Sequence, residues 1–153
     1  MSIADTLKSL GIELPPAPAP AANYVPFVKE GNLLFVAGQV PRAADGSLPY
    51  RGKVGVEITE QQGYEAAKLC ALNCLAQVQA ALGSLDKVKR IVQVRGFVNC
   101  AEGFGNQPEV INGASDVIVQ IFGDKGKHAR AAVGTNALPR NVATEVELVA
   151  IVE

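Results

Sequence analysis

The chain has 153 residues, of which 48% are apolar and 19% are charged, and its formal net charge is −1. This length accommodates one domain with a substantial core, and the composition excludes a disordered chain. The near-neutral charge disfavours nucleic-acid binding through a positive face, and no apolar run approaches the roughly 20 residues that span a bilayer.

The N-terminus and the cysteines bear on compartment and metal binding. The first residues lack the basic start and apolar core of a secretory signal, so we expect a cytoplasmic protein. Cys70 and Cys74 are four residues apart in a predicted helix, and Cys100 ends a predicted strand. An odd cysteine count argues against a disulfide framework, and a tetrahedral zinc site needs about four ligands. We therefore expect buried apolar cysteines and no metal site.

The N-terminal part predicts an extension ahead of the folded domain. Residues 3–10 form a candidate short helix. The prolines of PPAPAPAA, residues 15–22, remove backbone donors and favour an extended tether. The chain is therefore divided into an extension, 1–22, and a single domain, 23–153.

The domain begins with a predicted β-hairpin. Residues 24–29 and 33–40 are typical of two strands, and Glu30-Gly31-Asn32 between them indicates a turn. The following residues, 41–53, are rich in proline, glycine and aspartate and predict a loop.

A long amphipathic helix is predicted next, over residues 59–82. Thr59 is a candidate N-cap with Gln62 at the capping-box position, and Gly83 supplies a C-terminal stop. Apolar residues recur between them at steps of three or four, which is the helical period.

The second half of the chain predicts a strand, a helix and two further strands. Residues 91–98 are rich in β-branched residues, and Pro108 suits the start of a helix that ends at Gly123. Strands follow at about 130–136 and 144–152. The order β-β-α-β-α-β-β predicts an α+β fold with two helices on one face of a mixed sheet.

The other face of this sheet is predicted to be partly apolar. In the last strand, Val149 and Ile151 oppose the apolar set that begins at Val146. In the strand at 91–98, alternation places Ile91, Gln93, Arg95 and Phe97 on one side. Two helices cover only one face, so self-association would bury the second.

Arg130 is the first candidate functional residue, because it is a charge at the start of an apolar strand. Such a charge needs a partner, which makes Arg130 a candidate anion clamp with Glu145 as a proton-handling residue nearby. Two structural alternatives remain open: a surface arginine at a strand end, or one structural ion pair.

Glu145, Glu147 and His128 are the other ionisable candidates. The glutamates are two residues apart and share a face of one strand, so they need either a cation or exposure at a sheet rim. His128 is the only histidine. A histidine two residues before a strand is expected to be solvated, although it could act as a general base.

Four motifs in order resemble the RidA/YjgF family, also known as endoribonuclease L-PSP. They are GNLLFVAGQVP at 31–41, the helix at 59–82, FVN at 97–99 with VINGASDVIVQIFG at 110–123, and KHARAAVGTNALPRNVATEVELVAIV at 127–152. The likeness runs from about Tyr24 to the end of the chain.

The resemblance implies a chorismate-mutase-like fold, a homotrimer and ligand clefts between subunits. In deaminase members of the family an arginine binds the substrate carboxylate, and water hydrolyses a reactive enamine or imine to a 2-keto acid and ammonia without a cofactor. By likeness of motif, Arg130 and Glu145 are the catalytic residues. The substrate-binding residues are Tyr24, Ala37, Gly38, Asn112 and Ala132.

The chain departs from the family pattern at several positions, which leaves three functions open. Ala37 stands where deaminases commonly have serine, Ala132 where many members have cysteine, and Asn23-Tyr24-Val25-Pro26 replaces the usual Gly-Pro-Tyr start. The long extension indicates a divergent, longer branch. The alternatives are an enamine/imine deaminase, a non-catalytic trimer that binds small carboxylate metabolites, and, least favoured by charge, an endoribonuclease.

Overall fold

The computed structural model describes residues 1–153 and has its helices and strands close to the predicted ranges. The helices are α1 (Ile3–Ser9), α2 (Glu60–Leu82), α3 (Gln107–Phe122) and the short 3₁₀ turns η1 (Leu85–Lys87), η2 (Gly123–Gly126) and η3 (Pro139–Asn141). The strands are β1 (Phe27–Glu30), β2 (Leu33–Gln39), β3 (Val88–Asn99), β4 (Ala129–Thr135) and β5 (Thr144–Val152).

The predicted limits of the long helix are confirmed by its caps. The Thr59 side chain accepts from the Gln62 N–H, and the Gln62 side chain accepts from the Thr59 N–H in return. Gly83 ends the helix with φ at 79°, a left-handed conformation that glycine adopts without strain.

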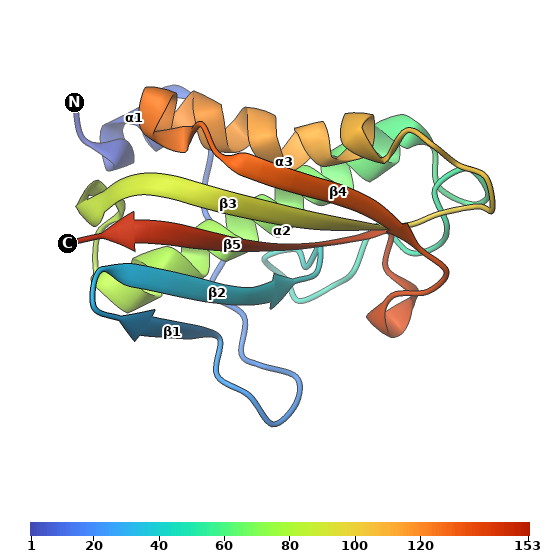
Figure 1. Cartoon of the computed structure of the whole chain (residues 1–153), viewed down its shortest axis with the longest axis horizontal. Helices are drawn as coiled ribbons and strands as arrows, with labels where there is room; N and C mark the ends of the chain where they lie inside the picture. The colour runs from blue at the N-terminus through green and yellow to red at the C-terminus, as the bar shows by residue number, and fades with distance from the viewer.

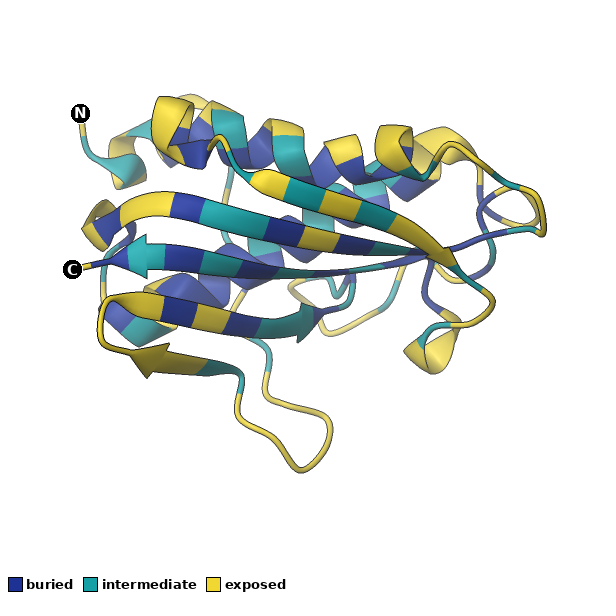
Figure 2. Cartoon of the chain, in the orientation of Figure 1, coloured by how far each residue is buried: buried dark blue, intermediate teal, exposed yellow.

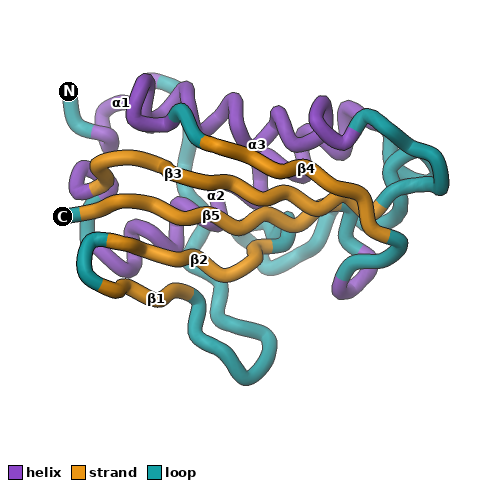
Figure 3. Tube along the Cα trace, in the orientation of Figure 1, coloured by secondary structure: helices purple, strands orange, loops and turns teal.

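The five strands form one sheet in the order β1-β2-β5-β3-β4 (Figures 1 and 3). β1 and β2 are an antiparallel hairpin, and β5 lies between β2 and β3, antiparallel to both. β4 runs parallel to β3, because α3 carries the chain back across the sheet before β4 begins. The mixed α+β architecture predicted from the sequence is confirmed.

The core lies between the sheet and the helices α2 and α3, which cover the same sheet face (Figure 1). Alternate residues of β5, among them Val146, Leu148 and Ala150, are buried there. α2 and α3 pack closely at Gly113, where an added Cβ would lie 1.9 Å from the Tyr64 carbonyl oxygen. None of the helices combines the length and apolar character needed to cross a membrane.

The opposite sheet face has no helix over it, and exposed residues alternate with buried ones along its strands (Figure 2). Several of these exposed residues are apolar. Val28 and Phe35 are 50% and 45% exposed, and Leu33 is also exposed. The expectation that Ile91 shares a side of the strand with Gln93, Arg95 and Phe97 is wrong. A register shift between Ile91 and Gln93 reverses the alternation, so Ile91 is buried in the helix-covered core.

The proline-rich extension has no helix or strand over residues 15–22, as expected of a tether. It is nevertheless attached, because the Pro18 carbonyl accepts from the Gln77 side chain of α2 at 2.6 Å. At the N-terminus, the Ile3 N–H donates to Asp86 at 2.8 Å. The extension is therefore bonded to α2 and to the segment that follows it before the chain enters the hairpin.

We predict that Gly113→Ala strongly destabilises the protein, because the new methyl group would have to push the two helices apart. Overpacking of this kind costs about 1–3 kcal/mol or more, and 1 kcal/mol corresponds to about 2–4 °C in melting temperature for a domain of this size. Gly105→Ala is the matched control, since nothing lies within 4 Å of its added Cβ. Thermal melts compare the two; equal melting temperatures would contradict the close packing.

Candidate functional site

The two predicted catalytic residues lie on opposite faces of the sheet. Arg130 of β4 pairs with Val94 of β3, and Val94 pairs with the core residue Leu148 of β5. Directly paired residues point to the same face, so Arg130 faces the helices. Glu145 is an odd number of residues from Leu148 along β5 and points to the open face. The prediction that Glu145 lies near Arg130 is therefore wrong within one chain.

Arg130 is held against the start of α3 by neutral groups. Its Nη1 donates to Asn112 Oδ1 at 2.8 Å and to Ser115 Oγ at 3.1 Å, and its Nη2 donates to the Pro108 carbonyl at 3.3 Å. The predicted residues Arg130 and Asn112 are thus brought together. Arg130 lies at the start of β4, is half-buried and forms no ion pair within the chain.

These bonds leave one edge of the Arg130 guanidinium available. A guanidinium has five N–H donors, and the three bonds use Nη1 twice and Nη2 once. The Nε–H and the second Nη2–H remain without partners in the chain. Nε and Nη2 lie on one edge of the planar guanidinium, the edge that can bind both oxygens of a carboxylate.

His128 belongs to the same cluster, contrary to the expectation of a solvated side chain. Its Nε2 lies 2.9 Å from Ser115 Oγ, and its Nδ1 lies 2.6 Å from the Gly126 carbonyl oxygen. Burial is the main cause that lowers the pKa of His128, and the Arg130 charge adds to it against the effect of the Gly126 bond. The sequence signal that was missed is the spacing of Asn112 and Ser115, which places both on one helix face. We call Arg130, Asn112, Ser115 and His128 the arginine half-site.

Four of the remaining predicted residues line a hollow of about 510 Å³ between the N-terminal segment and the end of the hairpin. The predicted residues in its wall are Tyr24, Ala37, Gly38 and Glu145, which we call the glutamate half-site. Charged residues that the sequence did not single out for this hollow also line it: Arg42, Arg140 and Glu147. Ala132 is not among them, because it points toward the helices like Arg130.

Gly38 makes room for the Glu145 carboxylate. A Cβ on Gly38 would lie 2.6 Å from Glu145 Oε1, closer than side-chain atoms approach. Burial is the main cause that raises the pKa of Glu145, and the charge of Glu147 adds to it. No hydrogen bond offsets these effects. A carboxyl group of this kind can take up and release a proton closer to neutral pH.

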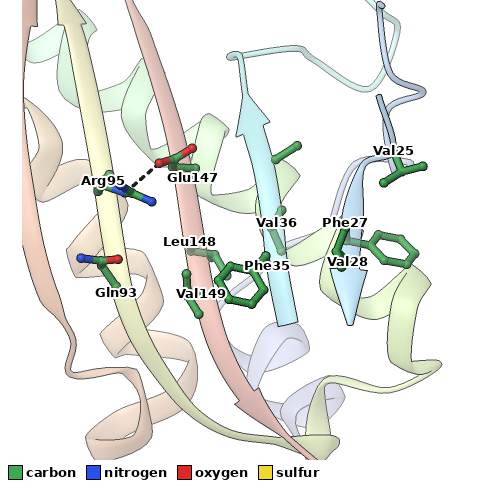
Figure 4. Close-up of a pocket in the computed structure, with 11 residues that line it drawn as sticks. Val25, Phe27, Val28, Phe35, Val36, Gln93, Arg95, Glu147, Leu148 and Val149 are labelled. Carbon is green, nitrogen blue, oxygen red and sulfur yellow. Dashed lines mark ion pairs between the residues drawn. The ribbon is translucent and has the colours of Figure 1, made fainter. Parts of the chain in front are cut away.

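Glu147 has a cation partner on the open sheet face. Its Oε1 lies 2.7 Å from Arg95 Nε (Figure 4). The pair borders a second, smaller hollow of about 240 Å³, whose other walls include Phe27, Phe35 and Val149. Of the two alternatives for the glutamates, a cation partner therefore applies to Glu147, whereas Glu145 has none.

The cysteines are buried, as expected. Cys70 Sγ contacts the Thr144 hydroxyl at 3.3 Å, and Cys74 donates to the Val146 carbonyl at 3.3 Å. Burial raises the pKa of both thiols, so neither offers a thiolate at neutral pH. No group of three or more histidine, cysteine and acidic side chains is placed to hold a metal ion.

Glu145→Gln should raise the melting temperature at pH 7. The pKa of Glu145 is raised from its ordinary 4.5. The stability linked to the protonated carboxyl is therefore fully present below pH 4.5 and lost as pH rises through the folded-state pKa. The neutral amide should thus stabilise at pH 7, and its advantage should disappear near pH 4. In thermal melts over this range, Glu147→Gln is the control, because it breaks the Arg95 pair and should not stabilise. A lower melting temperature for Glu145→Gln at pH 7 would contradict the assignment.

Comparison with known proteins identifies the family. The family model described as "YjgF/chorismate mutase-like, putative endoribonuclease" matches residues 4–152. Protein TCP17 of Trypanosoma cruzi is 47% identical over 146 residues, which cover 95% of this chain and 91% of that protein.

Solved structures agree with the sequence match. The crystal structure of a "putative endoribonuclease" from Shewanella oneidensis superposes with a TM-score of 0.96 at 34% identity, over 99% of this chain and 100% of that one. E. coli TdcF, solved with bound serine, gives a TM-score of 0.61 at 25% identity, over 90% and 94% of the two chains. The chain therefore belongs to the RidA/YjgF family and has its chorismate-mutase-like fold.

Proposed function

We propose that the protein is a homotrimer in which the arginine half-site of one copy meets the glutamate half-site of the next. The site so formed binds a small carboxylate and hydrolyses a 2-aminoacrylate-type enamine or imine to a 2-keto acid and ammonia. One observation carries the proposal: Arg130 has a free carboxylate-binding edge and Glu145 an unpartnered carboxylate, yet they lie on opposite sheet faces of one chain.

The open sheet face supports self-association. Exposed Val28 and Phe35 and the partly exposed Val149 form an apolar area beside the Arg95–Glu147 ion pair (Figure 4). A second copy would remove these side chains from water, at a gain of about 25 cal/mol for each Å² of apolar surface buried. Covering the same face would also shield Glu145, which lies on it.

The half-sites are chemically complementary. The arginine half-site offers two parallel N–H donors and one positive charge, which suit a carboxylate. The glutamate half-site offers a carboxyl group with a raised pKa in a hollow of about 510 Å³, which suits proton transfer to and from water. The arginine half-site alone has no group for proton transfer, and the glutamate half-site alone lacks the two parallel donors for the carboxylate.

The proposed reaction needs only these groups. Arg130 orients the substrate through its carboxylate. A water oxygen bonds to the imine carbon as the C=N electron pair moves to nitrogen, and Glu145 takes a proton from that water. Glu145 gives that proton to nitrogen, which forms a carbinolamine. Glu145 then takes the carbinolamine hydroxyl proton and passes it to nitrogen, so that the C–N bond breaks as the C=O bond of the 2-keto acid forms and ammonia leaves. Because such imines hydrolyse spontaneously, positioning contributes most of the acceleration.

Serine bound to E. coli TdcF is a small amino acid with the carboxylate that this site would take. The wall beside Glu145 favours a second candidate, a non-catalytic binder of small carboxylates, because Ala37 provides no hydroxyl there. Release of ammonia from a freshly generated 2-aminoacrylate-type imine decides between the two. An endoribonuclease is favoured only by the family description, since the net charge is −1.

Arg130→Ala should lower the affinity for a small 2-keto acid roughly tenfold to a hundredfold, because a charge-assisted bidentate contact is worth about 1.5–3 kcal/mol. Arg130→Lys should recover only part of this, since an ammonium group cannot present two parallel donors. Calorimetric titration with 2-oxobutanoate measures the affinity of the wild type and both variants, and ammonia release measures turnover.

Sedimentation equilibrium provides the control. All three proteins should have about three times the 16.0 kDa chain mass, because Arg130 faces the helices and not the open sheet face. Unchanged titration curves in Arg130→Ala would refute the carboxylate clamp. A wild-type protein that remains monomeric at micromolar concentration would refute the shared site.

A further inference from the structure

We propose that Ser115 and His128 are positioning residues that fix the Arg130 guanidinium through a directed chain of hydrogen bonds, so that its free edge is presented to the ligand carboxylate. This inference rests on the proposed carboxylate clamp. It assigns the only histidine a role through Arg130 and not as a general base on the substrate.

The direction of the hydrogen-bond chain follows from its first member. The Gly126 carbonyl can only accept, so the 2.6 Å contact places the proton of the neutral ring on Nδ1. Nε2 is then an acceptor and takes the Ser115 hydroxyl proton at 2.9 Å. The Ser115 oxygen keeps its lone pairs for Nη1 of Arg130, at 3.1 Å. Each group has one role, so the chain has one orientation.

This chain of hydrogen bonds determines which edge of the Arg130 guanidinium is free. Nη1 carries two protons, one held by Asn112 and the other by Ser115. Without Ser115 the guanidinium would keep a single strong bond at Nη1 and could rotate about it. The guanidinium is planar, so the donors of its Nε/Nη2 edge are parallel through covalent bonding. Fixing both Nη1 protons sets the direction in which this edge points, which is what bidentate binding of a carboxylate requires.

Protonation of His128 would break the chain, because both ring nitrogens would then donate and Ser115 would lose its acceptor. The charged groups on the elements that meet around the ring include Asp116 of α3, Asp124 and Lys125 of η2, Lys127 directly after η2, Arg90 of β3 and Arg130 of β4. Of these, Arg130 acts on the pKa of His128 and, together with burial, lowers it from 6.5. The His128 ring is therefore neutral at pH 7, and the hydrogen-bond chain through Ser115 is broken by protonation only below pH 6.5.

Two substitutions of His128 distinguish the role of its Nδ1 hydrogen bond to Gly126 from that of its Nε2 hydrogen bond to Ser115. The amide nitrogen of His128→Asn can replace Nδ1 but leaves Ser115 without an acceptor, whereas the amide oxygen of His128→Gln lies where Nε2 accepts. We expect Ser115→Ala and His128→Asn to weaken 2-oxobutanoate binding about twofold to tenfold at pH 7.5, the effect of one hydrogen bond. His128→Gln should recover most of the loss. As the pH falls below 6.5, binding by the wild type should weaken relative to His128→Gln, which does not titrate.

Tyr64→Phe is the matched control, because it removes the 2.8 Å bond to Asp116, next to Ser115 in α3, without touching Arg130. Its affinity should equal that of the wild type. A loss as large as in Ser115→Ala would mean that loosening α3 explains the effect, and would overturn the proposal. Wild-type affinity in Ser115→Ala and His128→Asn, with weak binding in Arg130→Ala, would overturn the positioning role and leave the clamp intact. Wild-type affinity in Arg130→Ala would overturn both.

A measurement without ligand completes the test. The chain has one histidine, so its two ring ¹⁵N resonances are assigned without ambiguity. At pH 7.5 they should show the Nδ1–H tautomer, and Ser115→Ala should shift the Nε2 resonance. An Nε2–H tautomer would contradict the proposed direction of the chain.

Discussion

Two helices cover one face of a five-stranded sheet, and most other features of this protein follow from that constraint. Side chains alternate between the faces of a strand, so every residue of β3, β4 and β5 either joins the helix-covered core or points to the open face. In β5 this separates Val146 and Leu148 from Glu145 and Glu147. The open face retains exposed Phe35 and Val28, whose burial requires another protein surface.

The same alternation divides the candidate site. Strand order places β4 at one edge of the sheet and the hairpin at the other, with the arginine half-site on the covered face and the glutamate half-site on the open one. Each half is built closely around its charged group. Asn112 and Ser115 hold Arg130, and the absence of a side chain at Gly38 leaves space for Glu145. Such local construction without a complete site is what a cleft shared between copies requires.

The fold could be predicted from the sequence because its signals are local. The capping box at Thr59, the left-handed stop at Gly83 and the period of the last strand all depend on neighbours within a few residues. Strand order and register depend on distant pairings, so the sequence placed Ile91 on the wrong face and Glu145 beside Arg130. The contacts of His128 were missed for the same reason, since Ser115 is 13 residues away.

Complementation between two inactive variants tests most directly whether the site is shared. Arg130→Ala lacks the clamp and Glu145→Gln lacks the proton-transfer group, so each should release ammonia from a 2-aminoacrylate-type imine far more slowly than the wild type. In trimers assembled from equal amounts of both, a site that takes Arg130 from one copy and Glu145 from the next is intact in about one quarter of cases. The account predicts recovery of about that fraction of wild-type activity in the mixture. No recovery, in mixed trimers verified by mass and with an active wild type, would contradict it.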